Sequence, residues 1–306
     1  MKQITLGNSG PKVSRLALWL MRSSLYEAKE METLLEKALE LGIDFVDNAD
    51  IYAWKNCAEE LYGQVMVNAP HLKEKFVVQT KCGICRGYYD SSYEHIMESV
   101  DTSLKRMNLD TIDVLLLHRP DALMEPEEIA RAFDELQAAG KVKHFGVSNM
   151  SPSQMEKLKR CVKQELIVNQ VQMSIVHAPL IDAGIYVNMK EDGALMRDGN
   201  LLDYVQTKGI TLQAWSILQT GWKQGSFLDH PDYGPLNESL TRLCEQYGVT
   251  KAAVAVAWLL RHPAGIQPIT GTTSPQHLEE LAKAVDIQLT RPEWYELYLA
   301  AGRNLP

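Results

Sequence analysis

Asp47 and Tyr52 bring together two side chains that can hold or transfer a proton, and both follow a short apolar run. The run 43–46 predicts a buried strand because it is continuous and apolar. Asp47 ends the run, and Tyr52 lies in the loop before a helix that we expect Asn56 to cap. A carboxylate and a phenol delivered by one strand suit the catalytic face of a barrel enzyme. Taken alone, a turn former and a core-edge tyrosine would fit as well.

Other polar or aromatic residues also end or directly follow apolar runs. They are Lys81, His118, Ser148, Asn149, Gln170, Trp215 and Ser216. Singly, each has an ordinary explanation, such as a solvated loop charge for Lys81 or a hydrogen-bonded strand end for His118. Their repeated placement at strand ends favours one shared site, because the ends of parallel strands converge on one face of a barrel.

Apolar strands alternate with helical segments along almost the whole chain. The eight expected strands are 16–20, 43–46, 76–80, 112–117, 142–147, 167–171, 210–215 and 266–269. Fully apolar strands that alternate with helices indicate a parallel sheet covered on both faces. The pattern predicts the α/β class and a closed (β/α)8 TIM barrel, as a single domain over residues 1–306.

Three segments fall outside this repeat. Residues 3–6 and 12–16 predict an N-terminal β-hairpin, and 291–301 predicts an extra C-terminal helix. The stretch 173–198 predicts an inserted loop, with a short hairpin as one option. A doubly wound sheet would be expected to carry Gly-x-Gly-x-x-Gly after an early strand, and the sequence has no such motif.

The net charge and the hydropathy of the chain argue against several classes of binding partner. The formal net charge is −8 and the pI is about 5.5, which argues against nucleic-acid binding and against docking to an anionic membrane. No apolar run reaches the about 18 residues of a membrane-spanning helix. The N-terminus lacks the apolar region of a signal peptide, so we expect a cytoplasmic protein.

Cys82 and Cys85 form one C-x-x-C among five cysteines. The pair has the spacing of a redox dithiol or of half a zinc site. An odd cysteine count argues against a disulfide framework, and no second C-x-x-C completes a zinc site. We therefore expect two reduced thiols and no metal.

Six segments resemble the motifs of the aldo-keto reductases, in the order in which that family carries them. They are 45–52 with Asp-x-Ala-x-x-Tyr, 78–83 with Thr-Lys, 114–121 with the histidine, 145–149 with Gly-x-Ser-Asn, 169–172, and 214–216. The resemblance covers almost the whole chain and is nearest to bacterial oxidoreductases that have Ala-Trp-Ser at 214–216. It implies a (β/α)8 barrel that binds a nicotinamide cofactor without a Rossmann motif.

The residue types permit the carbonyl reduction that the family performs. Hydride adds to the carbonyl carbon, and the oxygen must gain a proton. Tyr52 is the expected general acid, and a nearby Lys81 ammonium is expected to lower the pKa of its phenol. Asp47 would keep Lys81 charged, and His118 would donate a hydrogen bond to the carbonyl oxygen. The family assigns these roles to the matching positions.

The resemblance also implies NADP(H) as the cofactor, with NAD(H) as an alternative. Ser148, Asn149 and Gln170 would bind the nicotinamide carboxamide, and Trp215 would stack on the nicotinamide ring. The pyrophosphate and the adenosine 2′-phosphate would lie against two further segments, the second at a helix start that could also exist without a ligand. The residues expected there are Ser216, Leu218, Gly221, Gly271, Thr272, Thr273, His277 and Glu280.

Three positions depart from the family pattern. His277 stands where an arginine usually holds the 2′-phosphate, which puts a strong preference for NADPH in doubt. Ser216-Ile217-Leu218 replaces the usual Ser-Pro-Leu, and the run 17–21 lacks the glycine of the family's first strand. A bulkier pocket floor is therefore expected.

Trp19, Met21, Trp54 and the 173–198 loop are candidates for the substrate site, since aromatic and methionine side chains suit an apolar carbonyl compound. They would serve equally as core or loop anchors. The expected partner is a small-molecule carbonyl compound, and the expected state is a monomer or a weak homo-oligomer.

The sequence thus predicts an NADP(H)-dependent oxidoreductase that reduces an aldehyde or ketone. One alternative is a nicotinamide-binding sensor or regulatory subunit with little turnover, as in channel-associated members of the superfamily. Another, a barrel enzyme acting on a phosphorylated sugar, leaves the Asp-Tyr-Lys-His set unexplained.

Overall fold

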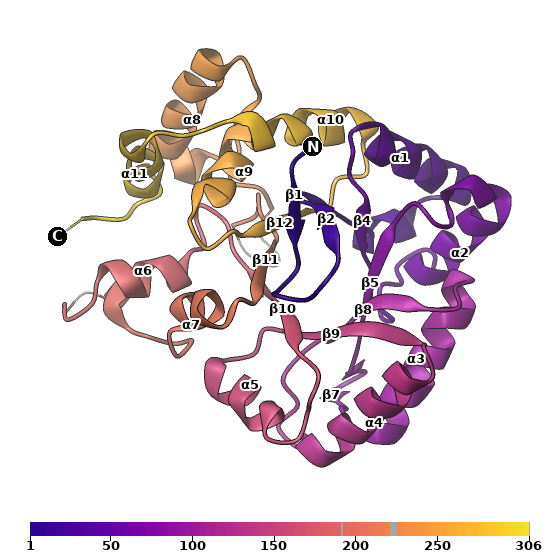
Figure 1. The fold of residues 1–306 in the computed structure, drawn as a ribbon. Coiled ribbons are helices and arrows are strands. Elements are labelled where there is room, and N and C mark those ends of the chain that lie inside the picture. Colours follow the sequence, from indigo (N-terminus) through magenta and orange to yellow (C-terminus); the bar gives the residue numbers. More distant parts are fainter. Residues whose placement is uncertain (191, 221–224, 306) are drawn as a thin grey trace.

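The computed structural model describes residues 1–190, 192–220 and 225–305. Eight parallel strands close into a barrel in the order β10-β11-β12-β3-β4-β5-β8-β9, surrounded by helices (Figure 1). The strands are β3 (Ala17–Trp19), β4 (Phe45–Asp47), β5 (Val77–Cys82), β8 (Ile112–Leu117), β9 (Val142–Ser148), β10 (Leu166–Gln172), β11 (Thr211–Trp215) and β12 (Gln267–Thr270). The predicted (β/α)8 barrel is confirmed, whereas the single-domain organisation stays a prediction.

Helices follow every barrel strand. They are α1 (Ala28–Glu40), α2 (Ala58–Asn68), α3 (Tyr93–Met107), α4 (Pro126–Ala138), α5 (Pro152–Lys159), α6 (Pro179–Ile185), α7 (Leu201–Lys208), α8 (Gly234–Tyr247), α9 (Lys251–Arg261), α10 (Pro275–Ala282) and the predicted C-terminal helix α11 (Arg291–Ala300). Several begin after a Ser or Thr whose side chain accepts a backbone N–H, as Ser151 does before α5 and Thr290 before α11. No helix in the described ranges is long and apolar enough to cross a membrane.

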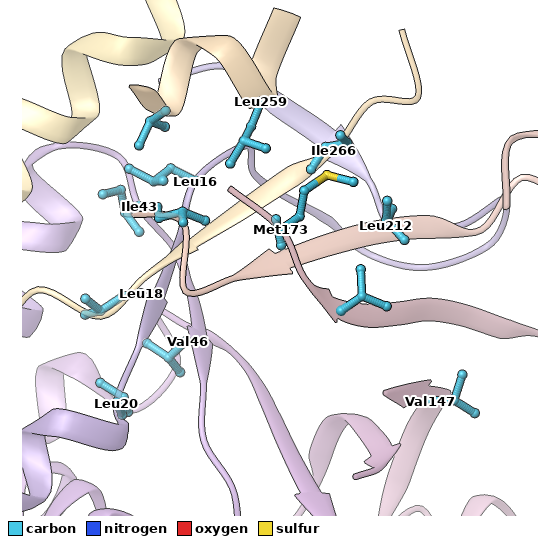
Figure 2. Packing of buried hydrophobic residues seen from close by; sticks show 14 of the residues in the cluster. Leu16, Leu18, Leu20, Ile43, Val46, Val147, Met173, Leu212, Leu259 and Ile266 are labelled. Carbon is cyan, nitrogen blue, oxygen red and sulfur yellow. The ribbon is translucent and has the colours of Figure 1, made fainter. Parts of the chain in front are cut away.

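Successive side chains of each barrel strand point to opposite sides, and this alternation divides the core in two. On β3, Leu18 packs between the barrel and the helices, whereas Ala17 and Trp19 belong to the cluster inside the barrel. Figure 2 shows part of this outer layer, in which Leu18, Val46 and Leu212 of the strands belong to one buried cluster with Leu259 of α9. Inward positions near the strand ends are therefore separate from the main apolar layer and can carry polar groups.

The predicted N-terminal hairpin closes one end of the barrel. β1 (Gln3–Thr5) and β2 (Lys12–Ser14) pair antiparallel and lie across the barrel opening in Figure 1. Leu6 and Val13 are fully buried and join the interior cluster. The Gly7 N–H donates to Thr211 Oγ1 over 2.8 Å, at the first residue of β11. The carboxyl ends of the strands form the opposite face.

Two loops differ from expectation. The hairpin option for 173–198 is wrong, because Pro179 begins helix α6 and the helix buries Leu180 and Ile181. The loop after β5 contains an unpredicted hairpin of β6 (Ile84–Cys85) and β7 (Tyr88–Tyr89). Its turn contains Gly87 with φ 94°, a conformation that favours glycine.

Asn56 does not cap α2, contrary to expectation. Cys57 is the N-cap residue and makes no side-chain capping hydrogen bond. Asn56 Nδ2 instead donates to the Tyr26 carbonyl oxygen over 2.6 Å, and its N–H donates to Ser24 O over 2.8 Å. The side chain therefore fastens the loop of Tyr52 to the segment after β3.

Gly63 on α2 offers a test of the helix packing, because a Cβ atom there would lie 2.0 Å from the Arg106 carbonyl oxygen of α3. We expect Gly63→Ala to push the helices apart and lower the free energy of unfolding by about 1–3 kcal/mol. The control is Gly184→Ala on α6, whose added Cβ would meet nothing within 4 Å. Urea unfolding of the two variants measures the difference, and equal stability would contradict the close approach of α2 and α3.

Candidate active site

The Asp47 carboxylate, the Lys81 ammonium and the Tyr52 hydroxyl lie in contact at the ends of β4 and β5. Lys81 Nζ is 2.7 Å from Asp47 Oδ2 and 3.1 Å from Tyr52 OH, and it donates to the Asn48 carbonyl oxygen over 2.7 Å. Asp47 and Lys81 are fully buried, and Tyr52 is 6% exposed. The strand pairing sets Asp47 opposite Gln79, two residues before Lys81. Three of the four predicted catalytic residues thus form one cluster.

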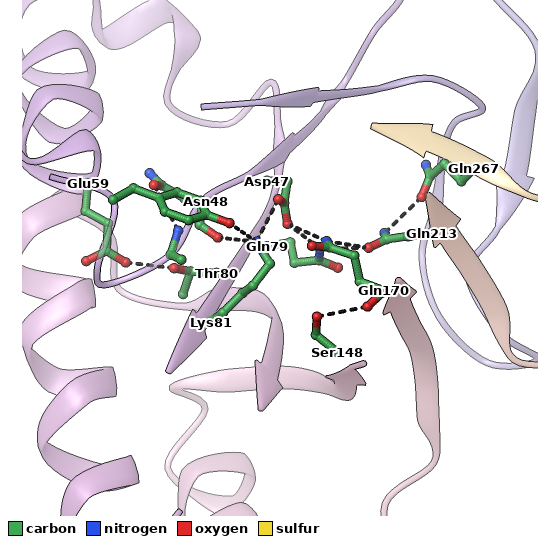
Figure 3. Close-up of polar contacts among 12 residues, drawn as sticks. Asp47, Asn48, Glu59, Gln79, Thr80, Lys81, Ser148, Gln170, Gln213 and Gln267 are labelled. Carbon is green, nitrogen blue, oxygen red and sulfur yellow. Dashed lines mark hydrogen bonds and ion pairs between the residues drawn. The ribbon is translucent and has the colours of Figure 1, made fainter. Parts of the chain in front are cut away.

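Four buried glutamines connect Asp47 to the opposite wall of the barrel (Figure 3). Gln79 and Gln170 each donate an amide N–H to Asp47 Oδ1, Gln170 over 3.0 Å. Both also donate to Gln213 Oε1, over 2.9 and 3.1 Å respectively. Gln213 Nε2 in turn donates to Gln267 Oε1 over 2.9 Å. The carboxylate is therefore fixed from several strands at once.

Gln79, Gln213 and Gln267 were not identified from the sequence. A signal was present, because residues two apart on a strand share a face. Gln79 stands two residues before Lys81, and Gln213 stands two residues before Trp215. A search for polar residues in step with the predicted site residues would have found both.

Burial and charge act in opposite directions on Tyr52 and Lys81. Burial raises the pKa of Tyr52, and the Lys81 charge pulls this pKa down without outweighing burial. Burial acts to lower the pKa of Lys81, but Asp47 and Tyr52 outweigh it and the pKa is raised. The expected net lowering of the Tyr52 pKa is therefore wrong for this structure, because the phenol is almost fully enclosed. Tyr52 is protonated and Lys81 is charged at neutral pH.

His118 faces Tyr52, with 5.9 Å between the ring centroids. Its backbone N–H donates to the Cys82 carbonyl oxygen over 2.8 Å, which extends the β5–β8 pairing by one residue. Burial, together with the charges of Lys81 and Arg119, holds the pKa of His118 well below its ordinary value. The imidazole is therefore neutral at pH 7 and has one N–H to donate.

Tyr52 and His118 line a cavity of about 340 Å³, which we call the Tyr52 cavity. The substrate candidates Trp19, Met21 and Trp54 all line it. The nicotinamide candidates on the same wall are Ser148, Asn149, Gln170 and Trp215. The unpredicted residues on the wall are Ile51, Ile84, Tyr89 and Arg119. The residues predicted for chemistry, nicotinamide and substrate therefore share one cavity.

Two residues of the site have left-handed backbone. Asn149 after β9 has φ 57°, and Ser216 after β11 has φ 55°. Such conformations in residues other than glycine gather at functional sites. Ser148 Oγ donates to the Gln170 carbonyl oxygen over 2.9 Å and accepts from Asn149 Nδ2 over 2.7 Å. These contacts fix the polar groups at the ends of β9 and β10.

A second cavity, of about 320 Å³, shares Trp19 with the first and is called the His277 cavity. The predicted cofactor residues on its wall are Ser216, Leu218, Gly271, Thr272, His277 and Glu280. Thr273 instead shares a hydrogen bond with the Tyr26 hydroxyl, 2.8 Å long. Gly221 lies outside the described residues. Arg22, which was not predicted, is the one arginine on the described wall.

The inserted segment borders a different cavity. His177 and Arg197, from 173–198, line a third cavity of about 680 Å³ with Trp215 on its wall. No described residue of 173–198 lines the Tyr52 cavity. The third cavity shares Arg119, Asn149 and Trp215 with the Tyr52 cavity, so a place for this segment in the substrate site stays a prediction.

Residues 18–298 match the model of the Aldo/keto reductase family. The chain belongs to this family. Oxidoreductase YdhF of Escherichia coli (strain K12) is 34% identical over 319 residues, covering 100% of both chains. The 6-dehydroglucose reductase of Agrobacterium fabrum is 36% identical over 286 residues, covering 90% of this chain and 89% of its own. A Bombyx mori aldo-keto reductase in complex with NADP has a TM-score of 0.73 at 22% identity, covering 98% of this chain and 92% of its own.

Family membership confirms the expectation of an oxidoreductase that uses NADP(H). The barrel of this aldo/keto reductase has the same fold as the Bombyx mori structure. The roles of individual residues are not decided by these similarities and follow as proposals.

Cys82 and Cys85 are free thiols in this aldo/keto reductase. Cys82 is 1% exposed, and burial raises its pKa well above the ordinary value. Cys85 Sγ lies 3.8 Å from His95 Nε2. The described residues contain no group of three or more His, Cys, Asp or Glu side chains that could hold a metal ion. That the thiols lack a redox role stays a prediction.

Asp50, in the loop that carries Tyr52, is partly buried, and the charge of the buried Glu59 acts on its carboxyl group. Burial and the Glu59 charge raise the pKa of Asp50 to about 7, against the charges of Arg106 and Lys81. Burial also raises the pKa of Glu59. Arg106 Nη1 donates to the Asp50 carbonyl oxygen over 3.2 Å and lies 3.5 Å from Glu59 Oε2.

Asp50 is expected to destabilise the fold as the pH rises. The unfolded chain releases its proton near pH 4, whereas the folded protein keeps it to about pH 7, so stability falls between these values and stays lower above them. At about 1.4 kcal/mol per pKa unit, Asp50→Asn should raise the free energy of unfolding by about 2–4 kcal/mol at pH 8 and by little at pH 4. Urea unfolding at both pH values measures this.

The control for this prediction is Asp232→Asn, because the Asp232 side chain is 81% exposed. It should change stability equally little at both pH values. A gain for Asp50→Asn that is the same at pH 4 and pH 8 would contradict the raised pKa.

Proposed function

We propose that this protein reduces an aldehyde or ketone to an alcohol, with hydride from NADPH and a proton from Tyr52. One observation carries the proposal: the Tyr52 hydroxyl lies 3.1 Å from the buried Lys81 ammonium and lines a cavity beside His118. A phenol held against a fixed cation is a proton donor whose conjugate base is stabilised in advance. The relative named 6-dehydroglucose reductase supports a carbonyl reductase.

The proton step uses groups that are already in place. As hydride adds to the carbonyl carbon, the oxygen gains negative charge and takes the Tyr52 proton. The phenolate that remains is stabilised by Lys81, whose own charge Asp47 maintains at 2.7 Å. Exchange with solvent then restores the Tyr52 proton. Burial disfavours the phenolate, so proton transfer depends on the charge developing on the substrate oxygen.

His118 would orient the carbonyl group. Its low pKa makes it neutral at pH 7, so it donates one hydrogen bond and leaves the proton transfer to Tyr52. Tyr52 lines the same cavity. The carbonyl oxygen would therefore accept two hydrogen bonds, one from the Tyr52 hydroxyl and one from the His118 N–H. This arrangement fixes the carbonyl carbon for attack from one face.

The Tyr52 cavity and the His277 cavity, which share Trp19 on their walls, fit a dinucleotide by their chemistry. The Tyr52 cavity offers amide and hydroxyl groups of Ser148, Asn149 and Gln170 for a carboxamide, and the flat ring of Trp215 for the nicotinamide. When bound, the cofactor supplies the hydride. Asn149 Nδ2 already donates to Ser148 Oγ, so these two side chains would be held in place before a carboxamide binds.

The His277 cavity would hold the phosphates and the adenosine. It contains Arg22, the exposed His277 and the start of α10, which suit anions, and Glu280, which suits a ribose hydroxyl. His277 in place of an arginine supports only a modest preference for NADPH over NADH, because an imidazole cannot make the two parallel hydrogen bonds that a guanidinium makes with a phosphate.

Tyr52→Phe tests the proposed function, because it removes the hydroxyl and keeps the ring. We expect NADPH oxidation with 4-nitrobenzaldehyde to fall by about 10² or more in kcat, while NADPH affinity, measured by protein fluorescence, stays within a few-fold. Tyr295→Phe on α11, which is 39% exposed, is the control and should match the natural protein. Near-normal turnover by Tyr52→Phe would exclude Tyr52 as the proton donor.

The same assay separates the enzyme from the alternative, a nicotinamide-binding sensor. A sensor would bind NADPH with the same fluorescence change and oxidise it no faster with aldehydes than without. The close contact of Tyr52 with Lys81 favours the enzyme, since binding a nicotinamide does not require a proton donor.

A further inference from the structure

Arg119 directly follows His118 and brings a full positive charge into the active face. It lines both the Tyr52 cavity and the third cavity. Its guanidinium carbon lies 5.8 Å from the centroid of the Trp215 ring, a cation–π contact. β9 and β10 separate β8 from β11 in the barrel, so the side chain reaches across the strand ends that carry Ser148 and Gln170.

The described residues give Arg119 no counter-ion. Arg119 has no ion pair and no hydrogen bond among the described contacts, whereas Arg303 lies 2.7 Å from Asp182. Asp198 shares the wall of the third cavity with Arg119 but forms no described ion pair with it. The remaining wall of the Tyr52 cavity carries no Asp, Glu or Lys side chain. The buried Asp47–Lys81 pair behind Tyr52 is neutral as a unit. The cavity therefore has a net charge of +1.

Arg119 is thus the one charged side chain on the described wall of the Tyr52 cavity, in a chain whose net charge is −8. A guanidinium presents five N–H donors in a planar fork that matches a carboxylate. Trp19, Trp54 and Tyr89 give the rest of this cavity broad aromatic surface. The cavity thus combines one anion-binding group with apolar walls, on the same face as the predicted proton donor.

We propose that Arg119 binds an anionic group of the substrate, so that this enzyme prefers aldehydes or ketones that also carry a carboxylate. The proposal rests on the proposed carbonyl reduction and specifies its substrate class. Because Arg119 is the next residue after His118, the carboxylate and the carbonyl would be bound by neighbouring positions of one strand end. Arg119 is then a specificity-determining residue, and the proton still comes from Tyr52.

A phosphate of the cofactor is the other anion that could meet this guanidinium. Arg119 does not line the His277 cavity, whose described wall holds Arg22 and His277 and most of the predicted phosphate residues. The position beside Tyr52 and His118 favours the substrate. The two sources differ in a measurable way, since loss of a phosphate contact would weaken NADPH binding itself.

The experiment compares 4-carboxybenzaldehyde with its neutral isostere 4-formylbenzamide, both with NADPH. Arg119→Met keeps the length of the side chain and removes the charge. We expect it to lower the ratio of kcat/KM for the acid to that for the amide by about 10- to 100-fold, the scale of a charge-assisted hydrogen-bonded pair, mainly through KM. Arg119→Lys should restore part of the ratio, and in the natural protein the KM for the acid alone should rise with salt.

The matched control is Arg131→Met on α4. Arg131 also stacks on an aromatic ring, 3.7 Å from the Tyr93 centroid, but on the outer surface of the barrel. The Arg131→Met substitution removes the same charge and should leave the ratio of kcat/KM for the acid to that for the amide unchanged. An equal ratio in Arg119→Met and the natural protein, or a weaker NADPH affinity in Arg119→Met at an unchanged ratio, would overturn the proposal.

Failure of the proposed function would look different. In that case neither aldehyde would oxidise NADPH in the natural protein. Turnover of both aldehydes at ratios that do not respond to Arg119 would leave the carbonyl reductase intact and remove only the carboxylate preference.

Discussion

The buried ion pair of Asp47 and Lys81 is the interaction on which the rest of the site depends. Both side chains are fully buried, and removing two charges from water is costly unless hydrogen bonds replace the lost solvent. Lys81 Nζ has acceptors in Asp47, the Asn48 carbonyl and the Tyr52 hydroxyl. Asp47 Oδ1 accepts from Gln79 and Gln170. The pair is therefore fully hydrogen-bonded, and the phenol is one of its partners.

The four glutamines connect the Asp47–Lys81 pair to strands on the other side of the barrel. They link the inner faces of β5, β10, β11 and β12 above the apolar interior, and Gln267 Nε2 donates to the Ser14 carbonyl oxygen at the closed end over 2.7 Å. A continuous series of hydrogen bonds thus connects the N-terminal hairpin with Asp47. Such a network holds the geometry around Asp47 rigidly, because a buried amide that loses a partner leaves a polar group unsatisfied.

Much of this arrangement could be predicted from the sequence. The alternation of apolar runs with helices gave the barrel, and in a barrel the strand ends converge, so Asp47, Lys81 and His118 could be placed together without knowing any distance. Tyr52 lies in the loop that follows the same strand as Asp47 and was placed on that face with it, whereas its role as proton donor was expected from the family motif. These predictions rest on periodicity, which the barrel geometry preserves.

Other features could not be predicted because they depend on tertiary contacts. The net direction of the Tyr52 pKa depends on how completely the phenol is enclosed, and the sequence shows only that a lysine is near. Asn56 is a residue type that commonly caps helices, but its side-chain amide donates instead to the Tyr26 carbonyl oxygen, 30 residues earlier in the chain. Arg119 lies in the segment 114–121, which resembles a family motif, yet its lack of a counter-ion becomes visible only when the walls of the cavity are known.

The most direct test of the account replaces the ion pair as a unit, with the double variant Asp47→Asn, Lys81→Met. A neutral pair of similar volume leaves no unpaired buried charge, so we expect its melting temperature to stay closer to that of the natural protein than that of Lys81→Met alone. The measurement is NADPH oxidation with 4-nitrobenzaldehyde by the folded double variant. The account predicts a loss of about 10² or more in kcat, because the Tyr52 phenolate has no cation. A folded double variant that retains near-normal turnover would contradict it.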